Sequence, residues 1–303
     1  MIAIGHGAAP PVPDPAQDNP RLGILLMIVS TVLFSLLWAL VKTLSQRYPV
    51  AEVSFFRSVL ALVPVGVLIA THGGWTLLKP HSLTGQIWRA VIGVTSMLLG
   101  FLSYHLMPLA DAVALSFTSP LMITALSVPM LGEKVGPWRW GAVVVGFAGV
   151  IILVDPSGSV FNLGALAAIG AAITSAFAMI TIRQLSRTDA PLTIVFYFHL
   201  FSSLLTVLPL PFLWVTPRVA DWGLMAAMGL AGGLGQYAMT RAYALASAAV
   251  ISPLNYVSLL WASLFGWILW NDVPALHVFV GAAVVVASGL FILYREGVRH
   301  RNG

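Results

Sequence analysis

The sequence predicts an all-α membrane protein with ten transmembrane helices, arranged as two inverted repeats of five helices each. Hydrophobic residues make up 59% of the chain and charged residues only 8%, whereas a soluble domain carries about a quarter charged residues. Ten apolar stretches, each close to the roughly 20 residues that a bilayer crossing needs, fill the chain from Leu22 to Tyr294. Lipid must therefore be the solvent for most of this chain.

Short links with turn-forming residues, such as Tyr48-Pro49, separate the expected helices. We place the helices at 22–45, 50–71, 85–107, 110–131, 137–154, 163–185, 190–214, 221–245, 248–270 and 274–295. With a cytoplasmic N-terminus, eleven basic residues fall on inner segments and three on outer links. This bias obeys the positive-inside rule, so both termini are expected in the cytoplasm and the membrane is the inner (plasma) membrane.

Features of the first five helices recur in the same order in the last five. The matched positions include Lys42 and Arg183, Arg57 and His199, and Tyr104 and Tyr243. Because five crossings leave the chain on the opposite side, the second repeat must lie upside down, which is typical of secondary transporters. We expect repeats at 22–155 and 163–295. Residues 1–21, which lack the basic start of a signal peptide, and 296–303 are expected to be cytoplasmic tails, the first of them disordered.

Three stretches carry a resemblance to a known family: VSFFR at 53–57, LSFTSPL at 115–121 and SLLWASLFGW at 258–267. Over residues 22–295 the chain resembles the EamA-type, ten-helix transporters of the drug/metabolite transporter superfamily. The resemblance implies alternating access between two five-helix halves and, most commonly, export. It also implies a central cavity lined by the first, third, fourth, sixth, eighth and ninth helices. Asn271-Asp272 departs from the Gly-Glu that is usual at that helix end.

An aromatic stripe that ends in a cation is predicted on the first helix. Phe34, Trp38 and Lys42 recur every four residues and therefore share one helix face. The matching stripe of the sixth helix consists of Ser175, Met179 and Arg183. A ring and a cation suit a zwitterion with an apolar side chain, because the cation takes the carboxylate and the ring takes the body. The alternative is structural, since cations near a helix C-terminus also cap carbonyl groups.

Polar side chains within other predicted helices are further candidates to line a cavity. They are Tyr104, Ser116, Ser119, Gln236, Tyr243, Asn255 and Ser258. Pro120 and Pro253 should interrupt the helical hydrogen bonds nearby, and broken polar spans in both halves indicate a site near the midplane. The alternatives are close helix packing for the serines and interface anchoring for the tyrosines.

Ionisable groups within a membrane span are costly and mark candidate functional sites. Those that either couple transport or tie helices together are Glu52, Arg57, Asp111, Arg183 and His199. No carboxylate falls in the middle of an expected helix, which favours facilitated diffusion over proton coupling. The sequence predicts no cofactor and no metal, and the absence of cysteine excludes thiolate ligands.

These features favour a carrier that exports small amphiphilic metabolites, with amino acids, and aromatic ones among them, as the first candidates. The alternatives are import of a planar vitamin-like compound such as riboflavin, or a channel-like facilitator. An enzyme is disfavoured because no catalytic set of residues is visible. The expected partners are the solute and the bilayer, but not nucleic acid, because the basic residues form no run. A homodimer through the glycine-rich fifth and tenth helices is one option, and packing of these helices within one chain is the other.

Overall fold

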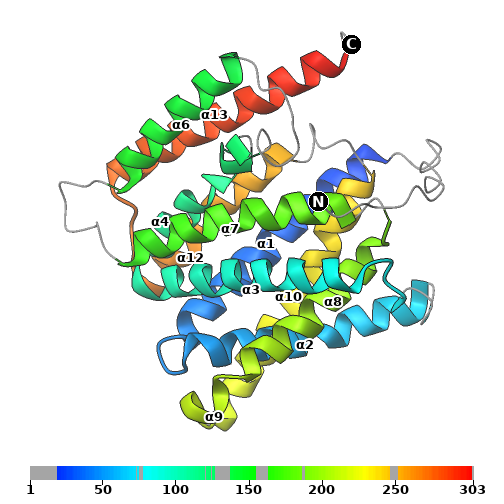
Figure 1. Cartoon of the computed structure of the whole chain (residues 1–303). Helices are drawn as coiled ribbons and strands as arrows, with labels where there is room; N and C mark the ends of the chain where they lie inside the picture. Colours follow the sequence, from blue (N-terminus) through cyan, green and yellow to red (C-terminus); the bar gives the residue numbers. More distant parts are fainter. Residues whose placement is uncertain are drawn as a thin grey trace.

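The computed structural model describes residues 19–72, 74, 78–119, 121–123, 125–126, 137–154, 163–185, 188–245 and 252–301. These residues form helices joined by short links, and none of them lies in a β-strand (Figure 1). The predicted tail at 1–18 lies outside the described residues, as do Pro120 and the final residues 302–303.

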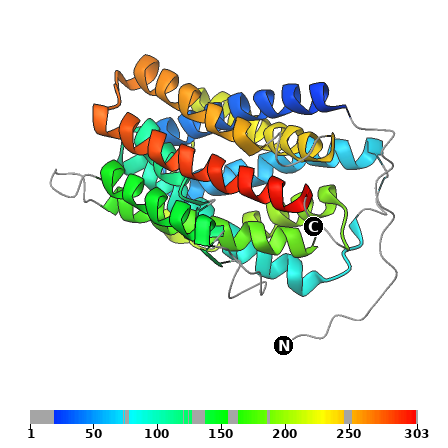
Figure 2. The same ribbon diagram turned by 90° about the horizontal axis from the view of Figure 1, so that it is seen from above.

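The described helices of the first half are α1 (Pro20–Leu44), α2 (Val50–His72), α3 (Leu83–Leu106), α4 (Leu109–Ser116) and α6 (Pro137–Val154). Those of the second half are α7 (Leu163–Leu185), α8 (Pro191–Val207), α9 (Leu210–Leu213), α10 (Trp222–Leu245), α12 (Val257–Trp270) and α13 (Leu276–Arg301), with short 3-10 segments η3 (Val219–Asp221) and η4 (Ser252–Tyr256). Seen from above, the axes of the long helices are roughly aligned, with the chain running along them in both directions (Figure 2).

Four helical segments are long and apolar enough to cross a membrane: Arg21–Leu44, Val50–Thr71, Leu83–Leu106 and Leu163–Ile182. Five shorter apolar helices accompany them in the described part of the chain. The protein is therefore a multi-pass membrane protein, built almost wholly from helices.

Three expected helices are interrupted, and one is longer than expected. The helix expected at 110–131 is broken after Ser116, where the next two amides bond to carbonyls only three residues back. Described residues beyond the break, among them 121–123, are again helical. The helix expected at 190–214 ends at Val207, close to Pro209, which lacks the amide hydrogen that a continuing helix needs. The described part of the helix expected at 248–270 starts with the 3-10 segment η4. In contrast, α13 continues to Arg301, so the expected tail is helical over 296–301.

Side chains at several helix ends explain where the helices begin or stop. The Asn19 side chain accepts a hydrogen bond from the Leu22 amide, and the Ser82 hydroxyl accepts one from the Gly85 amide (3.1 Å each), as is typical of N-caps. Asn271 ends α12 with a φ of 58°. This left-handed conformation favours glycine and tolerates asparagine best among the other residues. The departure from Gly at this position is therefore compatible with the same helix end.

The two halves interleave, and their packing is the same when the halves are exchanged. Helix α1 packs on α10 just as α7 packs on α3, and α2 packs on α10 just as α8 packs on α3. Helix α2 also packs directly on α8, and α6 packs on α13 along one edge of the molecule (Figure 1).

Residues that occupy equivalent places in the two repeats meet in space. Arg57 of α2 and His199 of α8 lie 3.5 Å apart between Nη1 and Nδ1. The alignment that pairs Tyr104 with Tyr243 also pairs Phe117 with Tyr256. The rings of Phe117 and Tyr256 pack edge to face, with centroids 5.0 Å apart. Contacts between equivalent residues are what an approximate two-fold axis between the halves produces.

Candidate solute-binding site

A cavity of about 250 Å³ lies between α1, α3, α4 and α7. Its lining residues are Trp38, Ser96, Met97, Gly100, Phe101, Tyr104, Ser116, Ala171, Ala172 and Ser175. Four of them, Trp38, Tyr104, Ser116 and Ser175, are residues that the sequence singles out as cavity candidates. None of the lining residues is charged, so the cavity presents rings, small side chains and hydroxyl groups.

Aromatic rings form one wall of this cavity. The Trp38 ring centroid lies 5.9 Å from that of Tyr104, and Tyr104 lies 6.2 Å from Phe101. Phe34 stacks on Trp38 at 6.2 Å and backs this wall without lining the cavity. Ring pairs at these separations attract one another, so the wall is preorganised to receive a flat apolar group.

Helix α3 contributes half of the lining, and sequence reasoning found only one of its residues. These lining residues follow one another at steps of three or four: Ser96 to Gly100, and Met97 to Phe101 to Tyr104. Such steps place them on one helix face. That spacing was the available signal. The spacing alone does not indicate a cavity, because this face mixes small, apolar and aromatic side chains, as ordinary helix packing also does.

Small residues of α7 allow it to lie close to α3. Ser96 donates its hydroxyl hydrogen to the Ala171 carbonyl at 3.0 Å. A Cβ on Gly100 would lie 3.9 Å from the Ala171 methyl group. The floor of the cavity is therefore backbone and methyl groups, with Ser175 as the polar group that α7 supplies.

The other predicted cavity residues lie elsewhere or bond within their own segment. Met179 is exposed, and the Ser258 hydroxyl donates to the Asn255 carbonyl at 2.6 Å. Ser119, Gln236 and Asn255 are partly buried and are not among the lining residues. The side chains of Arg183 and Tyr243 lie outside the described part of the chain.

Lys42 is held at one end of the molecule and does not point a free amine at the cavity. Its Nζ lies 3.1 Å from Asp272 Oδ2, donates to the Met107 carbonyl at 3.0 Å, and lies 4.9 Å from the centroid of the Trp270 ring. Asp111 is within electrostatic reach of this pair and of His277. The ion pair joins α1 of the first half to the link after α12 of the second.

The same end of the molecule holds a second set of polar ties between the halves. Glu52 is fully buried, and its Oε2 accepts from the Val215 amide at 3.0 Å. The carboxylate of Asp221 accepts from the Tyr48 hydroxyl at 2.7 Å and from Arg47 Nη1 at 2.9 Å. The Tyr48 hydrogen bond, aided by the charge of Arg47, holds the pKa of Asp221 below its usual value of 3.8.

Arg57 reaches the back of the cavity from α2. Its Nη1 lies 3.6 Å from the sulfur of Met97, a lining residue, and 3.5 Å from His199 Nδ1. The two titratable residues that the sequence pairs by repeat symmetry are thus in contact with each other, one side chain away from the cavity.

Comparison with known proteins identifies the family. The sequence matches the EamA-like transporter family over residues 21–155 and again over residues 162–294. The chain belongs to the EamA-like transporter family. The resemblance drawn from the sequence motifs is thereby confirmed, and the protein is a transporter.

Similar proteins of known name align over nearly the whole of this EamA-like transporter. The pseudopaline exporter CntI of Pseudomonas aeruginosa is 31% identical over 89% of this chain and 95% of its own length. A riboflavin transporter of Vibrio cholerae is 31% identical over 94% and 97%, and an S-adenosylmethionine uptake transporter of Rickettsia bellii is 26% identical over 93% and 96%. A crystal structure at 18% identity and a TM-score of 0.63, covering 89% of this chain and 95% of that one, shares the fold.

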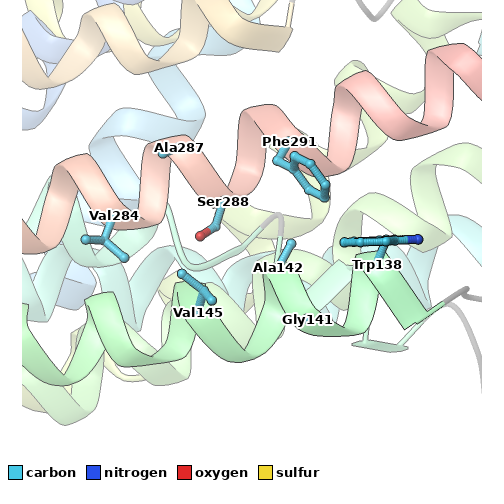
Figure 3. Close-up of a pocket in the computed structure, with 8 residues that line it drawn as sticks. All are labelled: Trp138, Gly141, Ala142, Val145, Val284, Ala287, Ser288 and Phe291. Carbon is cyan, nitrogen blue, oxygen red and sulfur yellow. The ribbon is translucent and has the colours of Figure 1, made fainter.

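A second, wider hollow of about 500 Å³ lies between α6 and α13 of the transporter. Figure 3 shows Trp138 and Phe291 at one end and Val145 and Val284 at the other, with Ser288 as the polar group among apolar neighbours. It contains no charged side chain among its lining residues. This hollow is lined by two helices only, whereas the cavity between α1, α3, α4 and α7 has Arg57 behind its lining. The latter is therefore the better candidate for a solute.

Proposed function

We propose that this EamA-like transporter is a secondary carrier that moves a small amphiphilic metabolite with a flat apolar body, and that its first candidate cargo is an aromatic amino acid moved outward. The observation that carries this proposal is the cavity between α1, α3, α4 and α7. Its wall of Trp38, Phe101 and Tyr104 suits a planar apolar group, and Ser116 and Ser175 supply hydroxyls from the two halves.

The size of the cavity favours an amino acid over a flavin. Its volume of about 250 Å³ lies below the roughly 300–1,000 Å³ of sites that hold drug-sized ligands. A three-ring flavin with its ribityl chain fills more of that range than a single amino acid does. A cavity this small therefore supports a compact cargo in the state that the structure represents.

The packing of the halves supports alternating access between two inverted repeats, at 22–155 and 163–295. The ties Lys42–Asp272, Glu52–Val215 and Arg47–Asp221 all join one half to the other at a single end of the molecule. That end is the outer one under the topology predicted by the positive-inside rule. We infer that these ties close the outer mouth and break when the cavity opens outward.

Movement down a gradient is the simplest energetic scheme. The cavity lining includes no carboxylate, and buried Glu52 accepts an amide hydrogen bond at the outer end. Proton relays in pumps use Asp, Glu or His near the solute path. His199, which contacts Arg57 behind the lining, is the nearest such group, and coupling through it is the alternative scheme. We therefore propose that the gradient of the cargo drives its own transport.

Uptake into proteoliposomes tests the proposal. The purified chain is expected to take up labelled phenylalanine or tryptophan saturably and to show counterflow, in which unlabelled solute inside accelerates entry of label. A channel would show no counterflow. If these vesicles take up neither amino acid while the control vesicles work as expected, the aromatic amino acid is overturned as cargo.

Riboflavin import is the second candidate, because the relative from Vibrio cholerae bears that name and matches 94% of this chain. The same vesicles separate the two. Riboflavin that competes for phenylalanine entry at lower concentrations than tryptophan does would favour the flavin. Symmetric, unaccelerated flux of both would instead favour a channel-like facilitator.

A homodimer through α6 and α13 stays a prediction, and the chain itself already occupies much of that face. Gly149 lies against Gly281 of α13, and a Cβ on either would approach the other's carbonyl oxygen to 3.0 Å or closer. Gly146 and Gly289 abut Leu121 and Tyr256. Gly141 has open space beside it, so it is the glycine still available for a second copy.

A further inference from the structure

Two arginines and a histidine from three helices meet behind the cavity without a counter-ion. Arg57 comes from α2, Arg89 from α3 and His199 from α8. The two arginines are each 6% exposed and His199 is fully buried. The salt bridges of the described residues are Lys42–Asp272 and Arg47–Asp221, and neither involves these three residues.

The three side chains converge on Phe198. The Arg89 guanidinium carbon lies 3.7 Å from the centroid of the Phe198 ring, and that of Arg57 lies 5.6 Å away. The charges of Arg57 and Arg89 repel each other, and both act on His199. A ring face attracts a guanidinium, but it leaves the N–H groups at the guanidinium edge without an acceptor.

Four nitrogen atoms of this cluster are buried without a hydrogen-bond partner among the described residues. They are Arg57 Nε, Arg89 Nε and Nη1, and His199 Nε2. Because Arg57 donates toward His199 Nδ1, the proton of a neutral His199 belongs on Nε2, which makes this nitrogen a donor too. The cluster therefore offers donors only, and burying cationic donors without an acceptor is costly.

Glycines of α3 and α10 lie against these side chains. A Cβ at Gly93 would lie 3.0 Å from Arg89 Nη1 and 2.8 Å from the Phe198 ring. A Cβ at Gly232 of α10 would lie 3.4 Å from Arg57 Nε. The two distances at Gly93 are tighter than ordinary contacts, so glycine at this position is what admits the Arg89 guanidinium, whereas the distance at Gly232 is that of an ordinary contact.

The cluster lies deep within the membrane-spanning bundle. Arg57 is the eighth residue of α2 and Arg89 the seventh of α3, each about 10 Å from its helix start at 1.5 Å per residue. These two helices run in opposite directions (Figure 1), so the two side chains enter from opposite ends and meet near the middle. Met97 contacts Arg57 and lines the cavity, so one flexible thioether side chain separates the cluster from the solute.

We propose that Arg57, Arg89 and His199 form a subsite for the anionic group, a carboxylate or a phosphate, of the transported solute, whose body lies against Trp38, Phe101 and Tyr104. This inference rests on the proposed function and adds the charge of the cargo to it. A planar guanidinium pairs with such groups through two parallel hydrogen bonds. The subsite takes over the role that the sequence suggests for Lys42, whose amine is bound to Asp272.

Matched pairs of solutes test the subsite. Phenylalanine is compared with phenylalaninamide, and riboflavin with riboflavin 5′-phosphate, in proteoliposome competition and in thermal unfolding of the purified full chain. We expect the member that carries the carboxylate or phosphate group to bind more tightly to the wild type in one of the pairs. Arg89→Met should weaken that binding by about tenfold or more, as expected for loss of a charged hydrogen bond. Arg241→Met, which removes an exposed arginine from α10, should leave binding unchanged.

Unfolding without ligand separates a binding role from a structural one. If Arg89 serves to bind the anionic group of the solute, its charge is uncompensated in the protein without ligand. Arg89→Met then removes this buried charge, and the unfolding temperature of the variant should equal or exceed that of the wild type. A marked drop in that temperature, repeated with Arg57→Met, would assign the arginines a structural role and overturn the proposal.

Two further outcomes also count against the subsite. The first is transport in which acid and amide are equivalent and Arg89→Met changes neither; this refutes the subsite and leaves the carrier function standing. The second is stabilisation by chloride or inorganic phosphate alone, lost in Arg89→Met while solute binding persists, which assigns the cluster to a free anion. Absence of transport of every solute by the wild type would instead be the failure of the proposed function.

Discussion

Trp38 is the residue through which the aromatic wall of the cavity connects to the rest of the transporter. It stacks on Phe34 of its own helix and packs against Tyr104 of α3. It is partly exposed because one side of the ring faces the cavity. A ring in this place has the apolar area to bind a flat solute and a fixed orientation in which to bind it.

Replacing Trp38 with alanine should therefore weaken solute binding with little change in folding. We expect the half-saturation concentration for the transported solute to rise by about tenfold, the equivalent of about 1.4 kcal/mol. Trp267→Ala is the matched control, because Trp267 is a tryptophan of α12 that is exposed on the outside of the bundle. Equal half-saturation concentrations for the wild type and both variants would mean that the solute does not bind in this cavity.

At the residue scale, helical spacing predicts which side chains share a helix face, but it does not predict what a neighbouring helix places against that face. Spacing is enough to find Trp38 on α1 and Ser175 on α7, which line one cavity. The same spacing also singled out Met179, which is exposed, because a stripe does not say how far a cavity extends along it. From the sequence, Arg89 is one of the eleven basic residues of the inner segments, and nothing local indicates that Phe198 of α8 will cover it.

At the scale of elements, the charged ties between helix ends are the contacts that we propose close the outer mouth of the cavity. Lys42 links the end of α1 to Asp272, which follows α12, and to the carbonyl of Met107 after α3. The sequence anticipates a cation that caps carbonyls here. It does not reveal the partner carboxylate, because Asp272 lies 230 residues away in the chain and approaches only through the packing of the two halves.

Breaking this tie should open the outer mouth. Lys42→Met leaves Asp272 one-third exposed and able to hydrate, so the loss of stability should be about 1 kcal/mol. A cysteine placed at Ser116 in this naturally cysteine-free chain should then react faster with an impermeant maleimide added outside. The charge swap Lys42→Asp with Asp272→Lys should bring the rate back toward the native one. Equal labelling with and without Lys42→Met would show that the ion pair does not control access.

The tie at Asp221 predicts a dependence of stability on pH. Since its pKa is lowered in the folded protein, mainly by the Tyr48 hydrogen bond, the carboxylate stabilises the fold at pH values above its unfolded pKa, near 3.8. That stabilisation disappears as the pH falls below 3.8 through the folded pKa. The unfolding temperature measured from pH 6 to pH 3 should therefore fall less steeply in Asp221→Asn than in the wild type, and Tyr48→Phe should lie between them. Parallel curves for the wild type and Asp221→Asn would refute this role.

At the scale of the whole molecule, the links between helices contact one another in two pairs, and each pair turns into the other when the two halves are exchanged. The link between α1 and α2 contacts the segment before α10, through Arg47 and Asp221. The link between α2 and α3 contacts the link between α7 and α8, where the His81 amide donates to Asp189 at 2.7 Å. The α1–α2 link and its counterpart in the second repeat, the α7–α8 link, therefore lie in different clusters of links. The sequence predicts this arrangement because an odd number of spans per repeat forces it, independently of where each helix is broken.

Labelling from the two sides of the membrane tests this inversion. Gln46 in the α1–α2 link and Thr188 in the α7–α8 link are both exposed and occupy equivalent links of the two repeats. Because the chain contains no cysteine, Gln46→Cys and Thr188→Cys each provide a single thiol. An impermeant maleimide should label Gln46→Cys in intact cells and should label Thr188→Cys only after the membrane is opened. Cysteines added at the two termini should behave like Thr188→Cys, because ten crossings return the chain to the side on which it started. Labelling of both links from the same side, or of the termini from different sides, would falsify the inverted repeat and, with it, an alternating-access cavity shared by the two halves.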